Sequence, residues 1–416
     1  MTENNDRTVK IKVEDLTLIF GKRKKEALAM LEKGASKEEI LKKTKCTVGI
    51  NKASFEVYEG EVFVVMGLSG SGKSTLIRCL NRLNEPTSGK VFFKDHDITR
   101  EGNKELMKTR RYEMSMVFQK FGLLPHKTIL ENAAFGLELR GEPKEEREKK
   151  ARQALETVGL KGYEEQLPSA MSGGMQQRVG LARALANDSE VLLMDEAFSA
   201  LDPLIKADMQ DELLQIQEKL QKTIVFITHD LDEAIKLGDR IVIMKDGVIE
   251  QIGTAEEILT NPASDYVEAF TEKVDRKTII TAETLMFRKP TLLHLKKDGP
   301  MQAIRKMRTI SVDVLPVEDE KRVFLGYVWL KDVLKLADRK ENSLQSVIRT
   351  EVPSVYSHYT VEEMLPLISN HNYPLAVVDE ESKRLLGIVT QTSLIIEATR
   401  FEREEVKELI EKANDI

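Results

Sequence analysis

Short apolar runs alternate with longer amphipathic stretches over roughly the first two thirds of the chain. The runs lie at 62–66, 191–194 and 224–227. A charged and apolar alternation from Val9 to Leu18 predicts a further strand, and residues 104–190 carry mainly helical patterns. Apolar strands alternating with helices are typical of an α/β sheet that is buried on both faces. We therefore expect an α/β domain at 1–275 with a helical subdomain at about 104–190.

The pattern changes after about residue 275. A segment that begins Leu315-Pro316-Val317 has a counterpart about 60 residues later, which begins Leu375-Ala376-Val377. Each is followed by a second apolar stretch, and amphipathic helices are predicted at 301–307, 331–337, 361–368 and 393–398. An internal repeat usually means two copies of one unit packed together. We expect a second, α+β domain at 276–400, followed by a helical, charged tail at 401–416.

Residues 21–50 interrupt the pattern after the first strand. Helical signals lie around Ala27 and from Ser36, where Glu39 is placed to complete a capping box. The segment has nine Lys and Arg residues and four Glu residues, a local balance of +5. Charge runs usually form a solvated surface, which favours an exposed helical hairpin. The alternative is a docking surface for a partner or for anionic lipid headgroups, and the sequence leaves both open.

Composition and net charge mainly exclude certain classes of protein. The 416 residues carry a net charge of −6, whereas a nucleic-acid-binding domain is usually basic. No apolar stretch approaches the roughly 20 residues that span a bilayer, and the polar N-terminus is no secretory signal. Cys46 and Cys79 have no metal-ligand spacing and are expected to be reduced thiols. If this protein moves a solute across a membrane, other subunits must form the path.

A glycine-rich loop follows the apolar run at 62–66. Its sequence, Gly67-Leu68-Ser69-Gly70-Ser71-Gly72-Lys73-Ser74, matches the phosphate-loop motif. The glycines let successive backbone N–H groups turn toward one anion, and the helix that follows adds its positive end. Lys73 is expected to reach the β- and γ-phosphates of ATP, and the Ser74 hydroxyl to ligate Mg²⁺.

Two carboxylates and a histidine follow the later apolar runs. Asp195 and Glu196 end the run at 191–194, and His229 lies beyond the run at 224–227. A buried strand that points both carboxylates at the nucleotide is favoured over a solvated strand end. Asp195 is expected to bind Mg²⁺, and Glu196 to orient and deprotonate the attacking water. His229 is placed to bridge the γ-phosphate and Glu196, so the expected catalytic groups are Lys73, Glu196 and His229.

A second anion site is predicted at Ser172, Gly173 and Gly174, which open a helix and so present backbone N–H groups beside a hydroxyl. Taken in order, the phosphate loop, Gln119, this Ser-Gly-Gly run, Asp195-Glu196 and His229 resemble the ATP-hydrolysing subunit of an ABC transporter. The resemblance implies a head-to-tail homodimer, in which the Ser-Gly-Gly of one copy closes on the phosphate loop of the other. Met171 and Met175 depart from the commonest form of this motif, but its phosphate-contacting core is intact.

The same resemblance implies further roles. Phe20 would stack on adenine, with a core aromatic as the alternative, and Asp202 would lie in the loop that crosses the dimer. Gln119 would join Mg²⁺ to the partner subunit, which the segment 121–126 would face. The expected nucleotide-binding residues are Phe20, Gly67, Ser69, Gly70, Ser71, Gly72, Lys73, Ser74, Thr75, Gln119, Ser172, Gly173, Gly174 and Asp202. The expected Mg²⁺ ligands are Ser74, Gln119 and Asp195.

Two features narrow the resemblance. The 21–50 insertion is absent from most ABC ATPases, and the 276–400 repeat resembles a tandem pair of cystathionine-β-synthase-type (CBS) domains. Together they resemble the ATPase subunit of bacterial glycine betaine/proline importers. This implies membrane permease subunits with a substrate-binding protein or domain as partners, no nucleic acid, and a peripheral position on the cytoplasmic face of the inner membrane. The runner-up is an importer of methionine or another amino acid. A non-enzymatic nucleotide sensor is disfavoured by the intact Lys73 and Glu196.

The CBS-like pair invites a regulatory interpretation. Adenosine-binding CBS domains carry a Gly-apolar-apolar-Thr/Ser-x-x-Asp run. The first copy here has Trp329 at the hydroxyl position, and the second copy has Ser393 in place of the acid. Three alternatives remain: cyclic di-AMP bound across a dimer interface, ionic-strength sensing by the basic residues Lys321, Arg322, Lys383 and Arg384, or dimerisation without a ligand.

Overall fold

The computed structural model describes residues 7–119, 122–199, 201–272, 274, 276–368, 371 and 373–399. The chain divides into two compact units, Met1–Thr271 (unit 1) and Glu272–Ile416 (unit 2). The predicted tail at 401–416 lies outside the described residues, as do Phe121 and Ala200 of two predicted loops. Within the described ranges, no helix is both long and apolar enough to cross a membrane.

Unit 1 is built on a six-stranded sheet with the strand order β10-β9-β3-β8-β7-β6. The strands are β3 (Val62–Met66), β6 (Met114–Phe118), β7 (Val191–Asp195), β8 (Thr223–Ile227), β9 (Arg240–Lys245) and β10 (Val248–Gly253). All neighbours are parallel except β9 and β10. Every residue of β3, β7 and β8 is buried, which confirms the three predicted apolar strands.

Strand β6 corrects one expectation, because it lies inside the range predicted to be helical. Its apolar run is only five residues long, so periodicity alone does not separate a strand from a turn of buried helix. Its pairing with β7 shows that the segment is a strand: Met116 lies opposite Leu193, and β6 forms an edge of the core sheet.

A second, antiparallel sheet has the order β2-β1-β4-β5. Its strands are β1 (Val9–Phe20), β2 (Thr47–Tyr58), β4 (Ser88–Phe93) and β5 (His96–Asp97). Between β1 and β2 the chain forms a hairpin of two helices, α1 (Lys24–Glu32) and α2 (Lys37–Thr44), and the predicted capping box of Ser36 and Glu39 is present. Ile19, Ala27 and Ile40 belong to a small core of this insertion.

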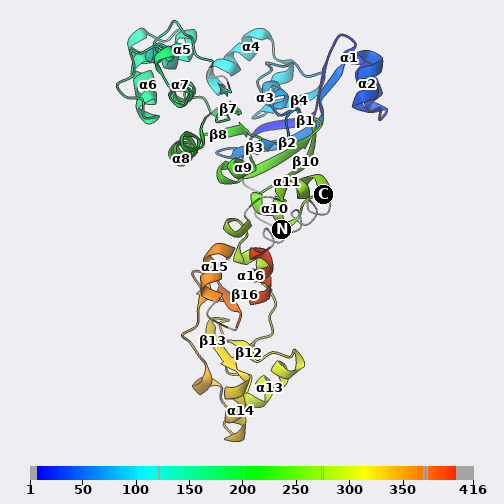
Figure 1. Ribbon diagram of the computed structural model, residues 1–416, viewed down its shortest axis with the longest axis vertical. Coiled ribbons are helices and arrows are strands. Elements are labelled where there is room, and N and C mark those ends of the chain that lie inside the picture. The colour runs from blue at the N-terminus through cyan, green and yellow to red at the C-terminus, as the bar shows by residue number, and fades with distance from the viewer. Residues whose placement is uncertain are drawn as a thin grey trace, which may run out of the picture. The chain divides into compact units, whose positions relative to one another are not determined.

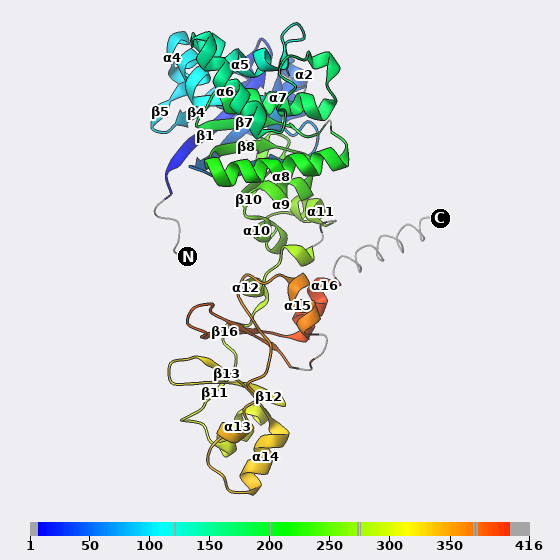
Figure 2. The same ribbon diagram turned by 90° about the vertical axis from the view of Figure 1, so that its left-hand side faces the viewer.

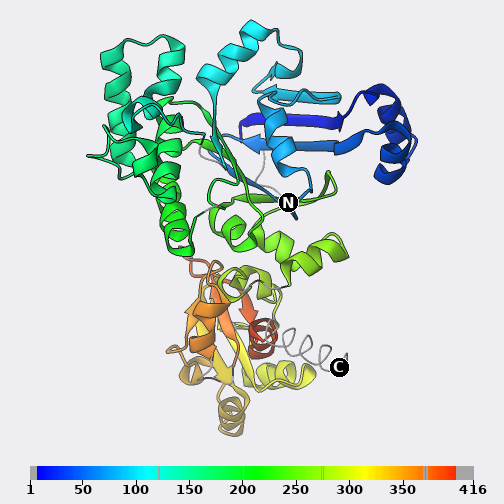
Figure 3. The same cartoon turned by 45° about the horizontal axis from the view of Figure 1, so that its top comes forward.

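The helices of unit 1 fall into groups around the sheets. They are α3 (Lys73–Leu80), α4 (Asn103–Lys108), α5 (Ile129–Arg140), α6 (Lys144–Thr157), α7 (Gly173–Ala186), α8 (Pro203–Leu220), α9 (Leu231–Leu237), α10 (Ala255–Thr260) and α11 (Asp265–Thr271). Helix α3 shares one hydrophobic core with residues of both sheets. Figure 1 shows α5, α6 and α7 as a group on one side of unit 1, with α1 and α2 on the other; Figure 3 shows the same separation.

Unit 2 contains the predicted repeat. Its first copy has β11 (Leu293–His294), α13 (Pro300–Thr309), β12 (Val314–Glu318), β13 (Phe324–Trp329) and α14 (Leu330–Asp338). The second has β14 (Ser354–Val355), α15 (Val361–Ile368), β15 (Leu375–Val378), β16 (Leu385–Val389) and α16 (Gln391–Ala398), and a short α12 (Ala282–Leu285) precedes both. In each copy the first strand pairs parallel and the third antiparallel with the second, so the topology is repeated (Figure 2).

Candidate functional site

The phosphate loop connects the carboxyl end of β3 to the amino end of α3. Gly67 has φ +145°, and a Cβ there would lie 2.2 Å from the carbonyl oxygen of Met244. Gly72 has φ +104°, and a Cβ there would lie 2.6 Å from the carbonyl oxygen of Gly49. Both glycines are therefore required, because β9 and β2 press against the back of the loop. The opposite side of the loop, at Ser69 and Gly70, is exposed.

Lys73 lies under this loop. Its Nζ donates hydrogen bonds to the carbonyl oxygens of Gly67 at 2.8 Å and Leu68 at 3.1 Å. The same atom is 4.0 Å from Oε1 of Glu196. Burial lowers the pKa of Lys73, while the carboxylates of Glu196 and Asp195 act in the opposite direction. A buried ammonium group at a glycine-rich loop is suited to pair with a phosphate.

Glu196 is the point at which three of the predicted residues meet. Its Oε2 accepts a hydrogen bond from Nε2 of Gln119 at 3.0 Å and lies 3.9 Å from Nδ1 of His229, while its Oε1 faces Lys73. The residue has φ +47°, which is uncommon outside glycine. This turn follows the last residue of β7, and strained backbone of this kind often occurs at functional sites.

Asp195 reveals a residue that the sequence analysis missed. Its Oδ2 accepts a hydrogen bond from Arg78 of α3 at 2.9 Å, and Arg78 lies one helical turn after Ser74, a spacing that places both on one face. Ser199 was also missed; its hydroxyl accepts a hydrogen bond from Gln119 and donates one to the carbonyl oxygen of Glu196.

The side-chain oxygen atoms predicted to bind Mg²⁺ are of the kind that this ion prefers. Asp195 is 2 % exposed, and its Oδ1 is buried without a hydrogen-bond partner. A carboxylate, a hydroxyl at Ser74 and an amide oxygen at Gln119 are hard ligands of the kind that Mg²⁺ takes. The residues present therefore fit this ion.

Phe20 lies close to the start of α3, on the other side of Gly49. It ends β1, is 42 % exposed, and its ring would be 2.9 Å from a Cβ at Gly49. The same Cβ would lie 3.3 Å from Cγ2 of Thr75 in α3. Phe20 and Thr75 thus flank Gly49 next to the phosphate loop, and the exposure of the ring argues against a core role.

The remaining predicted residues gather elsewhere in unit 1. Ser172 caps α7 by accepting a hydrogen bond from the backbone N–H of Met175, and Asp202 caps α8 through Ile205. A Cβ at Gly174 would lie 2.6 Å from Ile205, so the two helix starts are neighbours. Across the described residues, no hydrogen bond or ion pair joins this second cluster to the cluster around Lys73.

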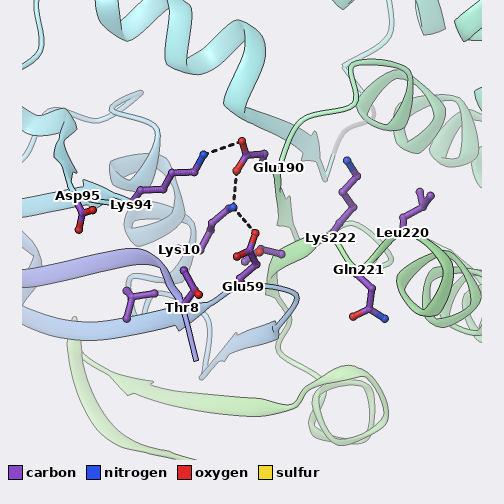
Figure 4. A pocket seen from close by; sticks show the side chains of 11 residues that line it. Thr8, Lys10, Glu59, Lys94, Asp95, Glu190, Leu220, Gln221 and Lys222 are labelled. Atoms are coloured by element: carbon purple, nitrogen blue, oxygen red, sulfur yellow. Dashed lines mark hydrogen bonds and ion pairs between the residues drawn. The ribbon is translucent and has the colours of Figure 1, made fainter. Parts of the chain in front are cut away.

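A cavity of about 730 Å³ lies near the amino ends of β7 and β8, at the opposite ends of these strands from Asp195 and His229 (Figure 4). Lys10 bridges Glu59 at 2.8 Å and Glu190 at 2.5 Å, and Lys94 also pairs with Glu190. Lys222 pairs with Asp188. Each lysine that lines the cavity thus already has a carboxylate partner, and the cavity has no part in the phosphate site.

Comparison with known proteins agrees with this geometry. The ABC transporter family model matches residues 50–199, and the CBS domain model matches residues 344–399. The glycine betaine transport ATP-binding protein OpuAA of Bacillus subtilis is 52 % identical over 391 residues, which are 94 % of this chain and 93 % of the relative. The glycine betaine/proline betaine transport system ATP-binding protein ProV of Salmonella typhimurium is 45 % identical over 93 % of this chain and 97 % of its own length.

A solved ABC transporter cassette, described as a dimer, covers 59 % of this chain and 98 % of its own, with 32 % identity and a TM-score of 0.51. The CBS model matches only the second copy of the repeat, but the first copy has the same strand order and pairing. This chain therefore belongs to the family of glycine betaine transport ATP-binding proteins, the ATPase subunits of ABC transporters with an ATPase cassette followed by CBS domains.

Proposed function

We propose that this ATPase powers the uptake of glycine betaine or proline-type osmolytes through a membrane permease, at the cytoplasmic face of a bacterial inner membrane. The ATPase assignment is carried by one observation, the convergence of Lys73, Gln119 and His229 on the Glu196 carboxylate beside the phosphate loop. The osmolyte assignment is supported by relatives that match nearly the whole chain and whose names specify glycine betaine. An amino-acid importer is the alternative.

Mg²⁺, held by Ser74, Gln119 and Asp195, would neutralise charge on the β- and γ-phosphates. The phosphate loop would bind these phosphates through its backbone N–H groups, and the ammonium of Lys73 would leave its present carbonyl partners to pair with them. Phe20 would stack on adenine, and Thr75 would lie beside it at the start of α3.

Glu196 would accept the proton of the attacking water. Its carboxylate is 19 % exposed, so water reaches it, while Gln119 holds one oxygen in place. His229 would orient the same water against the γ-phosphate. Each role needs the side chain at the carboxyl edge of the sheet, where β7 and β8 end side by side.

A homodimer is supported by the two separate clusters. The predicted second anion site and the predicted loop that crosses the dimer lie together, away from Lys73. Their residues are Ser172, Gly173, Gly174 and Asp202. In a head-to-tail pair, the Ser-Gly-Gly helix start of one copy would close on the phosphate loop of the other.

We propose that the permease docks at a cavity of about 350 Å³ in unit 1. It is lined by residues of β6, α5 and α7, among them Met116, Phe118, Phe135 and Arg183, together with Leu83 and Asn187. Leu83 is 49 % exposed, so an apolar side chain is available to a partner at this cavity. Because Gln119 directly follows Phe118 and binds Glu196, a permease segment seated here would act on the catalytic carboxylate.

Replacing Leu83 with aspartate should lower betaine-stimulated ATP hydrolysis about tenfold, because a charge would be buried at the centre of the contact. ATP affinity of the chain itself should be unchanged. Leu220→Asp, which alters a leucine of similar exposure beside the larger cavity, is the matched control. If Leu83→Asp hydrolyses ATP as the parent does in the assembled transporter, the permease docks elsewhere.

The basic residues named for ionic-strength sensing come together in unit 2. Arg322 lies in the turn between β12 and β13, and Lys383 lies in the turn between β15 and β16. The two turns are hydrogen-bonded to each other, because the N–H of Leu385 donates to the carbonyl oxygen of Arg322 and the N–H of Phe324 donates to that of Lys383. Lys321 and Arg384 lie in the same turns, and all four residues are exposed. The exposed Glu320, Glu380 and Glu381 lie in the same two turns, so the cluster carries both signs of charge. Its four bases remain the groups whose attraction to an anionic surface salt would screen.

Ordinary adenosine binding has less support. Arg349 stacks on Trp329 at 4.2 Å and pairs with Asp332 at 2.8 Å, so the first copy engages its own motif residues. In the second copy the Thr390 hydroxyl caps α16. Cyclic di-AMP bound across a dimer interface stays a separate hypothesis.

Osmolyte transport and its regulation can be tested together. The chain, co-expressed with its permease in liposomes, should hydrolyse ATP faster with glycine betaine, and only at high internal salt. Stimulation by methionine instead would favour the amino-acid importer. Addition of cyclic di-AMP should change the rate at fixed salt only if that nucleotide binds unit 2. A betaine response that is independent of salt would remove the ionic-strength hypothesis.

A further inference from the structure

The ring of His229 is exposed and makes no hydrogen bond to the described residues. The carboxylate oxygen of Glu196 that faces it lies 3.9 Å from its Nδ1, which is beyond hydrogen-bond distance. The direction of the imidazole therefore depends on the backbone turn formed by Thr228, His229 and Asp230, which connects β8 to α9.

The Thr228 hydroxyl holds this turn on both sides of His229. It accepts a hydrogen bond from the N–H of Asp230 at 3.0 Å, and it donates one to Oε2 of Glu233. Asp230 in turn caps α9 by accepting a bond from the N–H of Glu233 at 3.3 Å. Thr228 and Glu233 are both buried, so the turn is anchored to a carboxylate inside unit 1.

Helix α8 supplies the other groups that surround this carboxylate. Nε2 of Gln210 donates to Oε1 of Glu233 at 3.1 Å, and Nζ of Lys206 lies 3.7 Å from the same oxygen. Lys206 also pairs with Oδ2 of Asp230 at 2.5 Å. Gln210 lies one helical turn after Lys206, so both side chains leave one face of α8. This face thus binds Asp230 directly and Thr228 through Glu233.

The stability of the fold does not by itself account for these contacts. Taking two charges out of water costs about as much as their attraction returns, and apolar residues of similar volume often stabilise a core equally well or better. A buried polar network does restrict geometry, because its donors and acceptors are all satisfied in one arrangement only. The residues that this network holds are the two chain neighbours of His229.

We propose that Lys206 and Glu233 are positioning residues for His229: they hold the turn at 228–230 so that the imidazole faces the carboxylate of Glu196. Neither residue touches nucleotide or water in this role. The inference rests on the proposed part of His229 in orienting the attacking water. Loss of either residue would slow the chemical step and leave ATP binding unchanged, because the phosphate loop and Lys73 lie on other elements.

The test uses the full chain with its permease in liposomes and compares ATP hydrolysis by Lys206→Met with that of the parent. We expect kcat to fall about tenfold with KM for ATP within about twofold, since a small displacement of a catalytic group suffices for such a loss. Glu233→Gln keeps the size of the side chain and should have a similar effect. Lys206→Arg keeps the charge and should restore most of the rate.

A double variant shows whether Lys206 acts through His229. His229→Ala should itself lower kcat, and adding Lys206→Met to it should cause little further loss, because residues that act as one unit are not additive. Lys222→Met is the matched control and should keep the parent's kcat. The side chains of Lys222 and Lys206 are both 20 % exposed and paired with an aspartate, but Lys222 precedes β8, at the end opposite His229.

A kcat for Lys206→Met and Glu233→Gln equal to that of the parent would overturn this proposal alone. A further tenfold loss when Lys206→Met is added to His229→Ala, or an equal loss in Lys222→Met, would also overturn it. If His229→Ala turned over ATP at the parent's rate, the proposed role of His229 would fall together with the inference. Stimulation of the parent by glycine betaine tests transport independently of these variants.

Discussion

Glu196→Gln is expected to lower ATP turnover by at least about 100-fold while ATP binding and dimerisation persist. Glutamine keeps the shape of the side chain and the contact with Gln119, but its amide cannot take a proton from water. Oε1 and Oε2 of Glu196 lie 4.0 Å from Lys73 and 3.9 Å from His229, so the carboxylate faces the phosphate loop from the point where the strand ends. Single-turnover hydrolysis with equilibrium binding of ATP separates the two effects.

Glu165→Gln provides the control for this change. Glu165 is a glutamate with an 80 % exposed side chain, in the loop between α6 and α7, and should retain full turnover. If Glu196→Gln turned over ATP at nearly the rate of the parent, Glu196 would not be the base, and the role would pass to another group at this edge.

Lys73→Ala is expected to weaken ATP binding by about 10- to 100-fold, the effect of losing a charge-assisted contact with phosphate. The Lys73 side chain is 4 % exposed, and its Nζ already lies among the loop carbonyls, so little rearrangement separates it from a bound phosphate. Binding of a fluorescent ATP analogue at equilibrium measures this directly.

Two further variants show what causes the loss. Lys73→Met keeps the length of the side chain and should lose affinity nearly as much, because charge rather than volume is responsible. Lys161→Ala removes an exposed lysine that pairs with Glu156 and should bind as the parent does. Unchanged affinity in Lys73→Ala would contradict the assignment of the phosphate loop.

Much of the candidate site was predictable because its motifs are local. The glycines of the phosphate loop, the Ser172 cap and the Ser36–Glu39 capping box each depend on residues within a few positions of one another. Arg78 was within reach of the same reasoning, since it lies one turn beyond Ser74, but a single basic residue in a helix carries little signal by itself. Strand β6 was missed because its short apolar run has no period that excludes a helix.

By itself, the sequence determined three buried strands of the core sheet, the glycine-rich loop that follows the first of them and the presence of a repeated second unit. Only the tertiary structure decided which distant groups meet. Gln119 and Glu196 are 77 residues apart and Arg78 and Asp195 are 117 apart, and they touch because β6 pairs with β7 while β8 separates β7 from β3. Such contacts are set by strand order and packing of the whole core, which no short stretch of residues encodes.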